Sequence, residues 1–242
     1  MTTESSYRPT SSRVERRVRA LDFPFRPVAD LWPLFGIRVR SRRLELRPPG
    51  DEEIAALATV ARRGIHDPGV MPFPHGWTDR TGDDFDRGFA QYFWAQRACW
   101  SRDSWTLPFA VFLGGQPVGV QQVSAEGFPV MRTVGTSSWL ARSVQASGIG
   151  TEMRAAVLDF AFGALGAEVA TSTAYTFNTA SIRVSEKLWY EENGVRREVV
   201  RGRSQDTLLF RISRDAWTQY EHTPARVQGL DAARAYFEER FS

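Results

Sequence analysis

The sequence has little cysteine, little lysine and no long apolar run. Cys99 is the only cysteine in 242 residues, so no disulfide can form within the chain, and we expect a reducing, cytoplasmic location. No stretch approaches the roughly 20 apolar residues that a membrane-spanning helix needs. The polar start lacks the apolar core of a secretory signal. We therefore expect neither a membrane protein nor a disulfide-stabilised secreted domain.

Lysine is as scarce as cysteine, because Lys187 stands alone and arginine supplies nearly all the positive charge. Residues 1–47 contain eleven arginines and five acidic residues. We interpret residues 1–33 as a basic arm, 34–220 as one domain and 221–242 as a helical extension. A basic arm can meet an anionic partner, but arginine richness is also typical of GC-rich coding. The chain has no groove pattern of aromatic and basic residues, so nucleic-acid binding is not favoured.

Metal ligands at a useful spacing are also missing, so no metal is expected. What is present is enough apolar sequence, 42% of residues, to bury one substantial core. Hydrophobic periodicity predicts a mixed α/β (α+β) domain with a central sheet of about six or seven strands flanked by helices. The predicted strands are 37–48, 104–115, 116–127, 132–144, 167–175, 195–202 and 206–213, and the predicted helices are 50–64, 85–101, 145–162, 179–190 and 231–241. Hairpin links between several strands exclude a doubly wound sheet.

Residues 145–162, QASGIGTEMRAAVLDFAF, combine a helical apolar face with two glycines at its start. Gly148 and Gly150 allow close backbone approach, and the first-turn N–H groups of a helix bind phosphate oxygens. A P-loop is excluded because no lysine follows the glycines, and Met153 occupies the third glycine position of a dinucleotide fingerprint. The remaining phosphate motif is Q/R-x-x-G-x-G/A, and a helix start with chance glycines is the alternative.

Residues 138–190 carry a resemblance to a known family. The glycine motif is followed about 28 residues later by NTAS, after an intervening strand, and this combination resembles the coenzyme A-binding core of GNAT superfamily N-acyltransferases. The chain is most similar to their RimJ/RimL-type branch, from RVRSRRLELRPPGDEEIAAL at the front to about Ser213. The segments HDP, MPF and GTEMRAAVL also resemble the corresponding segments of actinobacterial members that use succinyl-CoA.

The resemblance implies a GNAT fold in which the fourth and fifth strands splay apart and admit the pantetheine arm. The arm's amides would pair with the open edge of the fourth strand. The pyrophosphate would lie on the N–H groups of residues 145–151. The residues expected to bind the cofactor are Leu140, Arg142, Val144, Gln145, Ser147, Gly148, Ile149, Gly150, Thr151, Asn178 and Ser181.

Acyl transfer also requires protonation of the departing thiolate. The family often places a tyrosine seven residues after the asparagine, but Ser185 stands there in this chain. Ser181 matches the serine used in the RimL-type branch and is our preferred donor, with Ser185 as a weaker candidate. A capping role is the alternative for both Ser181 and Asn178. Trp189 replaces a small family residue, and Tyr190 is expected in the core.

The amine site is expected between loop 64–84 and the aromatic helix that follows it. The candidate substrate-binding residues are His66, Phe73, Trp77 and Tyr92, with core packing as the alternative for the aromatic ones. The general base is poorly determined, and Glu126, His66 and Asp84 are all candidates.

The expected function is transfer of an acetyl group from acetyl-CoA to a primary amine of a small molecule or protein. Transfer from succinyl-CoA ranks second. A catalytically silent acyl-CoA-binding regulatory module is the alternative from another class. A homodimer is left open.

Overall fold

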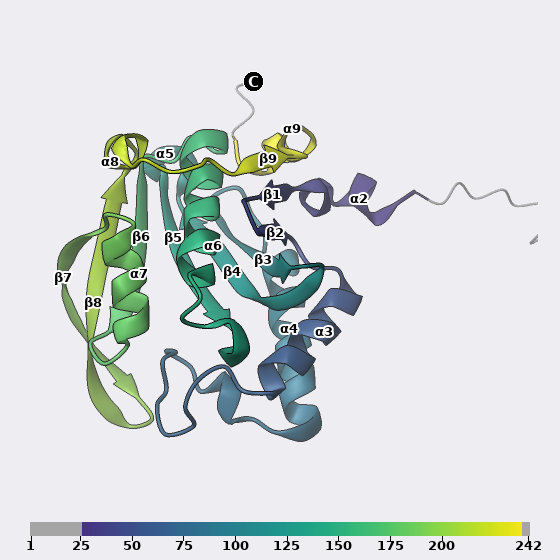
Figure 1. Ribbon diagram of the computed structural model, residues 1–242. Coiled ribbons are helices and arrows are strands. Elements are labelled where there is room, and N and C mark those ends of the chain that lie inside the picture. Colours follow the sequence, from purple (N-terminus) through teal and green to yellow (C-terminus); the bar gives the residue numbers. More distant parts are fainter. Residues whose placement is uncertain (1–25, 239–242) are drawn as a thin grey trace, which may run out of the picture.

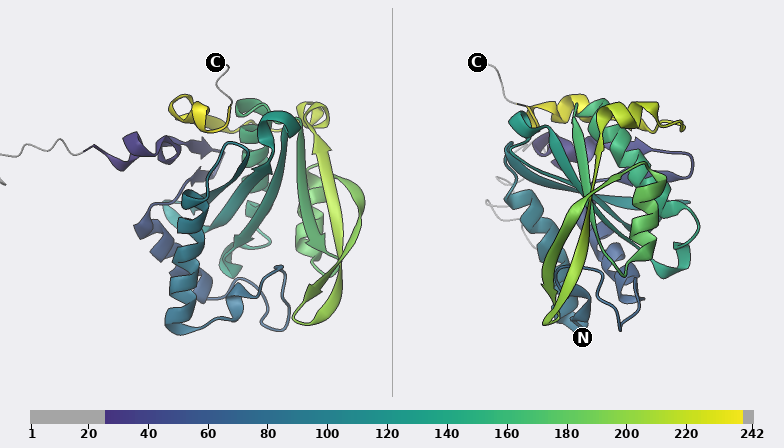
Figure 2. Two further views of the ribbon diagram at one scale, coloured as in Figure 1. Left: turned by 180° about the vertical axis from the view of Figure 1, so that it is seen from behind. Right: turned by 90° about the vertical axis from the view of Figure 1, so that its left-hand side faces the viewer.

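The computed structural model describes residues 26–238. Most of the predicted basic arm and the end of the predicted helix 231–241 lie outside the described residues. The described chain forms one nine-stranded sheet in the order β7-β8-β6-β5-β4-β3-β2-β1-β9. Helices cover both faces of this sheet, which the right-hand view of Figure 2 shows nearly edge-on. The predicted mixed α/β fold is confirmed.

The strands are β1 (Arg38–Arg40), β2 (Leu44–Arg47), β3 (Ser104–Leu113), β4 (Gln116–Glu126), β5 (Thr133–Leu140), β6 (Val169–Tyr175), β7 (Glu191–Val200), β8 (Arg203–Ser213) and β9 (Arg226–Gln228). The α-helices are α2 (Val28–Leu31), α3 (Asp51–Arg62), α4 (Gly82–Ala98), α5 (Phe128–Met131), α6 (Ile149–Leu158), α7 (Thr179–Lys187), α8 (Arg214–Gln219) and α9 (Leu230–Ala233). A π-helical turn, Asp159–Ala164, continues α6.

The expected strand number was too low for two reasons. The alternating stretch 37–48 is not one strand but a hairpin, because a turn at residues 41–43 separates β1 from β2, which pair antiparallel. The chain then returns at its C-terminal end to place β9 beside β1. A three-residue strand has no periodicity that sequence alone could reveal.

The turn between β7 and β8 also differs from expectation. It lies at Arg201 and Gly202, with φ angles of 47° and 71°, whereas the predicted strands 195–202 and 206–213 put the link between them after residue 202. Two central residues with positive φ are what a tight two-residue hairpin turn requires. Arginine rarely adopts this geometry, so the sequence did not indicate the turn.

β5 and β6 are parallel neighbours that separate along their length. Their pairing runs only from Thr133 opposite Val169 to Thr136 opposite Ser172. β5 then continues alongside β4, while β6 continues alongside β8, so residues 137–140 have a free edge facing β6. Figure 1 shows the two strands diverging from this point. The predicted splay is therefore present, and we call the pair Thr136 and Ser172 its vertex.

Each face of the sheet has its own helices. The buried face of α6 includes Ile149, Met153 and Val157, and the π-helical turn continues it with Phe160, as the periodicity predicts; this face packs in the main core. α3 and α4 pack on the other face in a second apolar cluster. Because successive strand residues alternate between faces, even-numbered β5 and β6 residues face α6 and α7, and odd-numbered ones face α4. No helix in the described part of the chain is long and apolar enough to cross a bilayer.

Candidate functional site

The loop before α6 presents a row of backbone donors. Gly148 is the N-cap of α6 with φ 81°, and Ala146 also has a positive φ of 57°. Within residues 26–238, the N–H groups of residues 146–151 donate to no protein acceptor. The Gln145 N–H does donate, to Arg142 O at 3.3 Å, so the free row starts one residue later than expected. Free N–H groups at the positive end of a helix form a cradle for an anion.

Glu152, in the first turn of α6, holds this loop against the β1–β2 turn. Its carboxylate accepts hydrogen bonds from the Ser41 hydroxyl at 2.8 Å, Arg43 N at 2.8 Å and Arg43 Nε at 2.6 Å. Arg43 also donates to Ser147 O at 3.2 Å. Burial raises the pKa of Glu152, but the bonds from Ser41 and Arg43 outweigh it, and the pKa is lowered. The cradle is therefore held in place before any ligand binds.

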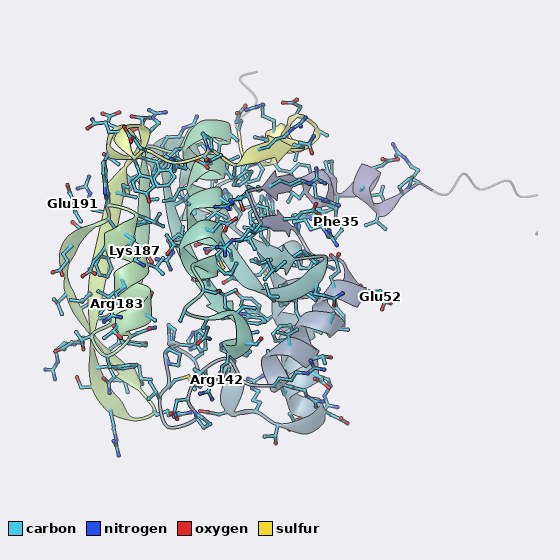
Figure 3. The ribbon with its side chains drawn as sticks, in the orientation of Figure 1. Phe35, Glu52, Arg142, Arg183, Lys187 and Glu191 are labelled. Carbon is cyan, nitrogen blue, oxygen red and sulfur yellow. The ribbon has the colours of Figure 1, made fainter. Side chains whose placement is uncertain are left out.

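The other predicted cofactor residues surround the cradle. The Gln145 side chain donates to Ile65 O at 2.7 Å and Leu140 O at 2.8 Å, so it orders the loop. Leu140 and Ile149 are buried, whereas Arg142 and Ser147 are exposed. Figure 3 shows Arg142 at the loop, and Arg183 and Lys187 along α7. These cations favour a negatively charged ligand on this face. Val144, Gly150 and Thr151, which are partly buried, complete the predicted set.

α7 begins beside the splay with Asn178 as its N-cap. Asn178 Oδ1 accepts the Ser181 N–H at 3.2 Å, so the capping alternative holds for Asn178. Ser181 is not the cap, and its partly buried hydroxyl makes no hydrogen bond within the described residues. That hydroxyl is free to act on a ligand.

Ser185, one turn later, is fully buried. Its hydroxyl donates to Ser181 O at 3.3 Å and accepts from Arg154 Nη1 at 3.1 Å. These contacts make Ser185 part of the interior and argue against its weaker catalytic assignment. Tyr190 is in the core, as expected. Trp189 adopts φ 61°, a region that favours glycine, which explains a small residue at this position in the family.

The opposite face of the splay carries the expected amine site. Tyr92 Oη accepts from Gln122 Nε2 at 2.6 Å, and Ser137 donates to Gln122 Oε1 at 2.9 Å. Ser137 lies in the half of β5 that is unpaired on its β6 side. The hydrogen-bonded side chains of Tyr92, Gln122 and Ser137 therefore lead from α4 to the splay. Phe73 and Trp77 pack against the second cluster as partly buried residues.

Loop 64–81 is held by its own contacts and by the β7–β8 hairpin. His66 Nδ1 lies 2.8 Å from Asp67 O, and its Nε2 lies 2.8 Å from the Thr78 hydroxyl. At the hairpin turn, the Arg201 guanidinium bonds to the Asp79 carboxylate and to Pro68 O at 3.1 Å. The loop is therefore tied across the mouth of the splay, and both nitrogens of His66 are engaged.

One of the base candidates, Glu126, lies away from the splay, and a second, Asp84, is paired on the surface. Glu126 is exposed at the end of β4, opposite Ser104, beyond the closed end of the β5–β6 pair. Asp84 is exposed and forms an ion pair with Arg87 at 2.6 Å. The position of Glu126 beyond the closed end of the β5–β6 pair argues against it as the general base, whereas Asp84 stays a prediction.

A family model described as an acetyltransferase (GNAT) domain matches residues 43–190. The chain belongs to this GNAT family. Family membership makes it an acyl-CoA-dependent N-acyltransferase, with acyl-CoA and an amine acceptor as its ligands.

Solved structures show the same fold. Mycobacterium smegmatis RimJ in complex with CoA-disulfide has a TM-score of 0.60 and 24% identity, covering 84% of this chain and 94% of that one. RimL, a ribosomal L7/L12 alpha-N-protein acetyltransferase in complex with coenzyme A, has a TM-score of 0.59 and 16% identity, covering 73% and 97%. A GCN5-related N-acetyltransferase from Brucella melitensis has a TM-score of 0.59 and 20% identity, covering 75% and 80%.

Sequence reasoning missed three residues of this GNAT site. Arg154 is buried near the vertex, where it contacts Ser172. Gln122 links Tyr92 to β5, and Arg201 fastens the acceptor loop. An arginine among the apolar residues of the α6 stripe was a signal in the sequence that could have identified Arg154 as a buried charge. Nothing local distinguishes Gln122 or Arg201.

Proposed function

We propose that the protein transfers an acyl group directly from a coenzyme A thioester to a primary amine in the splay. The donors at residues 146–151 would hold the pyrophosphate, and the free edge of residues 137–140 would pair with the pantetheine amides. The observation that carries this proposal is that the free edge and the cradle are continuous. The half of β5 that is unpaired on its β6 side ends at Leu140 and leads directly into the cradle loop.

The chemistry requires a C–N bond to form as the C–S bond breaks. A coenzyme A thioester supplies the acyl group, and a backbone N–H on the free edge of β5 would polarise its carbonyl oxygen. The amine would approach from the α4 side, past Tyr92 and loop 64–81. The free hydroxyl of Ser181 would donate a proton to the departing sulfur, and the proton that the amine nitrogen loses would restore the hydroxyl, so that an amide and a free thiol result. Ser181 lies at the start of α7, on the face that carries the cradle.

The sequence ranks acetyl-CoA before succinyl-CoA as donor, and the acceptor is a primary amine of a small molecule or a protein. The structural neighbour RimL is a ribosomal L7/L12 alpha-N-protein acetyltransferase, so peptides with free N-termini belong in an acceptor panel.

The experiment is release of free thiol from acetyl-CoA and from succinyl-CoA with a panel of amines and peptides. Calorimetric binding of coenzyme A is measured in parallel. We expect amine-dependent thiol release with one donor class. Tight binding without release would support the silent regulatory module, and absence of coenzyme A binding would contradict both functions.

A further inference from the structure

Arg154 lies inside the protein without a counter-charge. Its side chain projects from α6 and the residue is 4% exposed. Nη1 donates to the hydroxyls of Ser172 and Ser185, each at 3.1 Å. Within residues 26–238 no carboxylate pairs with it, Nε has no partner, and Nη2 donates to no acceptor. Burial accordingly lowers the pKa of Arg154.

A guanidinium in this state is costly to the fold. Taking a charge out of water costs several kcal/mol unless an opposite charge and hydrogen bonds compensate. Two serine hydroxyls compensate only one nitrogen of Arg154. The Tyr190 hydroxyl beside it is also buried, and the Thr136 side chain is its polar neighbour. The unpaired guanidinium of Arg154 therefore marks a place between α6 and α7 where an anionic ligand group would be stabilised.

The cluster lies at the vertex of the splay. Ser172 is the β6 partner of Thr136 in the last bridged pair, and its hydroxyl faces α6 and Arg154. An arm that starts at the cradle and follows residues 140 to 137 ends at this vertex. The group that meets Arg154 is therefore the acyl end of the donor.

The shape of the unpaired side of the Arg154 guanidinium favours one kind of anion over another. With Nη1 fixed by the serines, the remaining Nε and Nη2 form the planar fork that binds both oxygens of a carboxylate. A thiolate is a single point charge that arises only after transfer, whereas a donor carboxylate balances Arg154 whenever the donor is bound. We propose that Arg154, positioned by Ser172 and Ser185, binds a terminal carboxylate of the acyl group through Nε and Nη2, so that the preferred donor is a coenzyme A thioester of a dicarboxylic acid. This inference rests on the proposed function and reverses the acetyl-first ranking from sequence.

The test compares the binding of coenzyme A, acetyl-CoA and succinyl-CoA by calorimetry, which needs no knowledge of the acceptor. Wild type should bind succinyl-CoA about tenfold or more tightly than acetyl-CoA, as expected for a charge-assisted bond. Arg154→Met should abolish this difference and leave acetyl-CoA affinity within about twofold. Arg211→Met, which removes an exposed arginine from β8, should keep the preference. Apo Arg154→Met should melt at or above the wild-type temperature, because it loses an unpaired buried charge.

Each other outcome overturns the inference. Equal affinity of wild type for the two thioesters would show that the cluster holds only buried water. An equal loss of affinity for both thioesters in Arg154→Met would indicate that Arg154 acts on the sulfur or only in packing, and not on a carboxylate. If that variant fails to fold, Arg154→Gln takes its place with the same expectation. Coenzyme A affinity separates the two proposals: intact coenzyme A binding without a succinyl preference contradicts only the inference, and no coenzyme A binding contradicts the proposed function itself.

Discussion

Gly148 adopts a left-handed backbone conformation, and this geometry aims the neighbouring N–H groups away from the protein. An L-residue in this region costs about 1–2 kcal/mol, and a β-branched one fits worst. We expect Gly148→Val to weaken coenzyme A binding at least tenfold, about 1.4 kcal/mol, in calorimetry. Gly163→Val is the matched control, because a side chain there meets open space. Unchanged affinity in a folded Gly148→Val protein would place the pyrophosphate elsewhere.

Ser181 is the second residue whose effect can be isolated. Asn178 caps α7, so removing the Ser181 hydroxyl leaves the cap intact. Ser181→Ala should lower kcat about tenfold or more and leave acyl-CoA affinity unchanged, because the hydroxyl matters mainly as charge develops on sulfur. Asn178→Ala should instead cost about 1 kcal/mol of stability. A wild-type kcat in Ser181→Ala, measured by thiol release, would remove Ser181 from the mechanism.

At the scale of elements, Glu152 couples α6 to the β1–β2 turn, and its lowered pKa makes this coupling pH-dependent. A carboxylate whose folded pKa lies below its unfolded value stabilises the fold at higher pH. We expect Glu152→Gln to cost about 1–2 kcal/mol at pH 7 in urea denaturation. The difference from wild type should shrink as the pH falls below 4.5, the ordinary Glu value, and through the lower folded pKa.

Glu126→Gln is the control for that pH series, because Glu126 is exposed and forms no ion pair within the described residues. It should change stability by less than about 0.5 kcal/mol at every pH. A Glu152→Gln difference that stays constant down to pH 3 would show that packing, and not the charged hydrogen bonds, explains the loss.

At the scale of the whole molecule, the C-terminal segment closes the main core. Phe237 is 1% exposed and lies edge-on to Trp105 at 5.1 Å and to Trp100 at 5.4 Å. Phe237→Ala should reduce the free energy of unfolding by about 3–5 kcal/mol in urea denaturation, since a large cavity forms. Val130→Ala, at an 87% exposed position, should change it by less than about 0.5 kcal/mol. A small effect at Phe237 would mean that the segment is only loosely attached.

The elements that sequence predicted well are those with strong local patterns. α3, α4, α6 and α7 carry amphipathic periodicity, and α3 adds acids in its first turn and an arginine in its last. The cradle was predictable for the same reason, because a helix start with Gly148 and Gly150 defines its own backbone donors. The C-terminal helix was less well predicted: α9 spans only Leu230–Ala233 before a 3-10 turn.

Local patterns along the chain were enough to predict α3, α4, α6 and α7, most of the strands, the glycine cradle and the family resemblance, because each of these is encoded by short motifs. Only the tertiary structure decided the place of β9, the tie between Arg201 and loop 64–81, and the burial of Arg154 beneath the splay. Each depends on groups far apart in sequence, such as Arg154 and Ser185, brought together when the sheet and its helices pack. Ser181 illustrates the two levels. Its position was predicted from a sequence motif, whereas the structure shows that Asn178 caps α7 and that the Ser181 hydroxyl is therefore not needed as the cap.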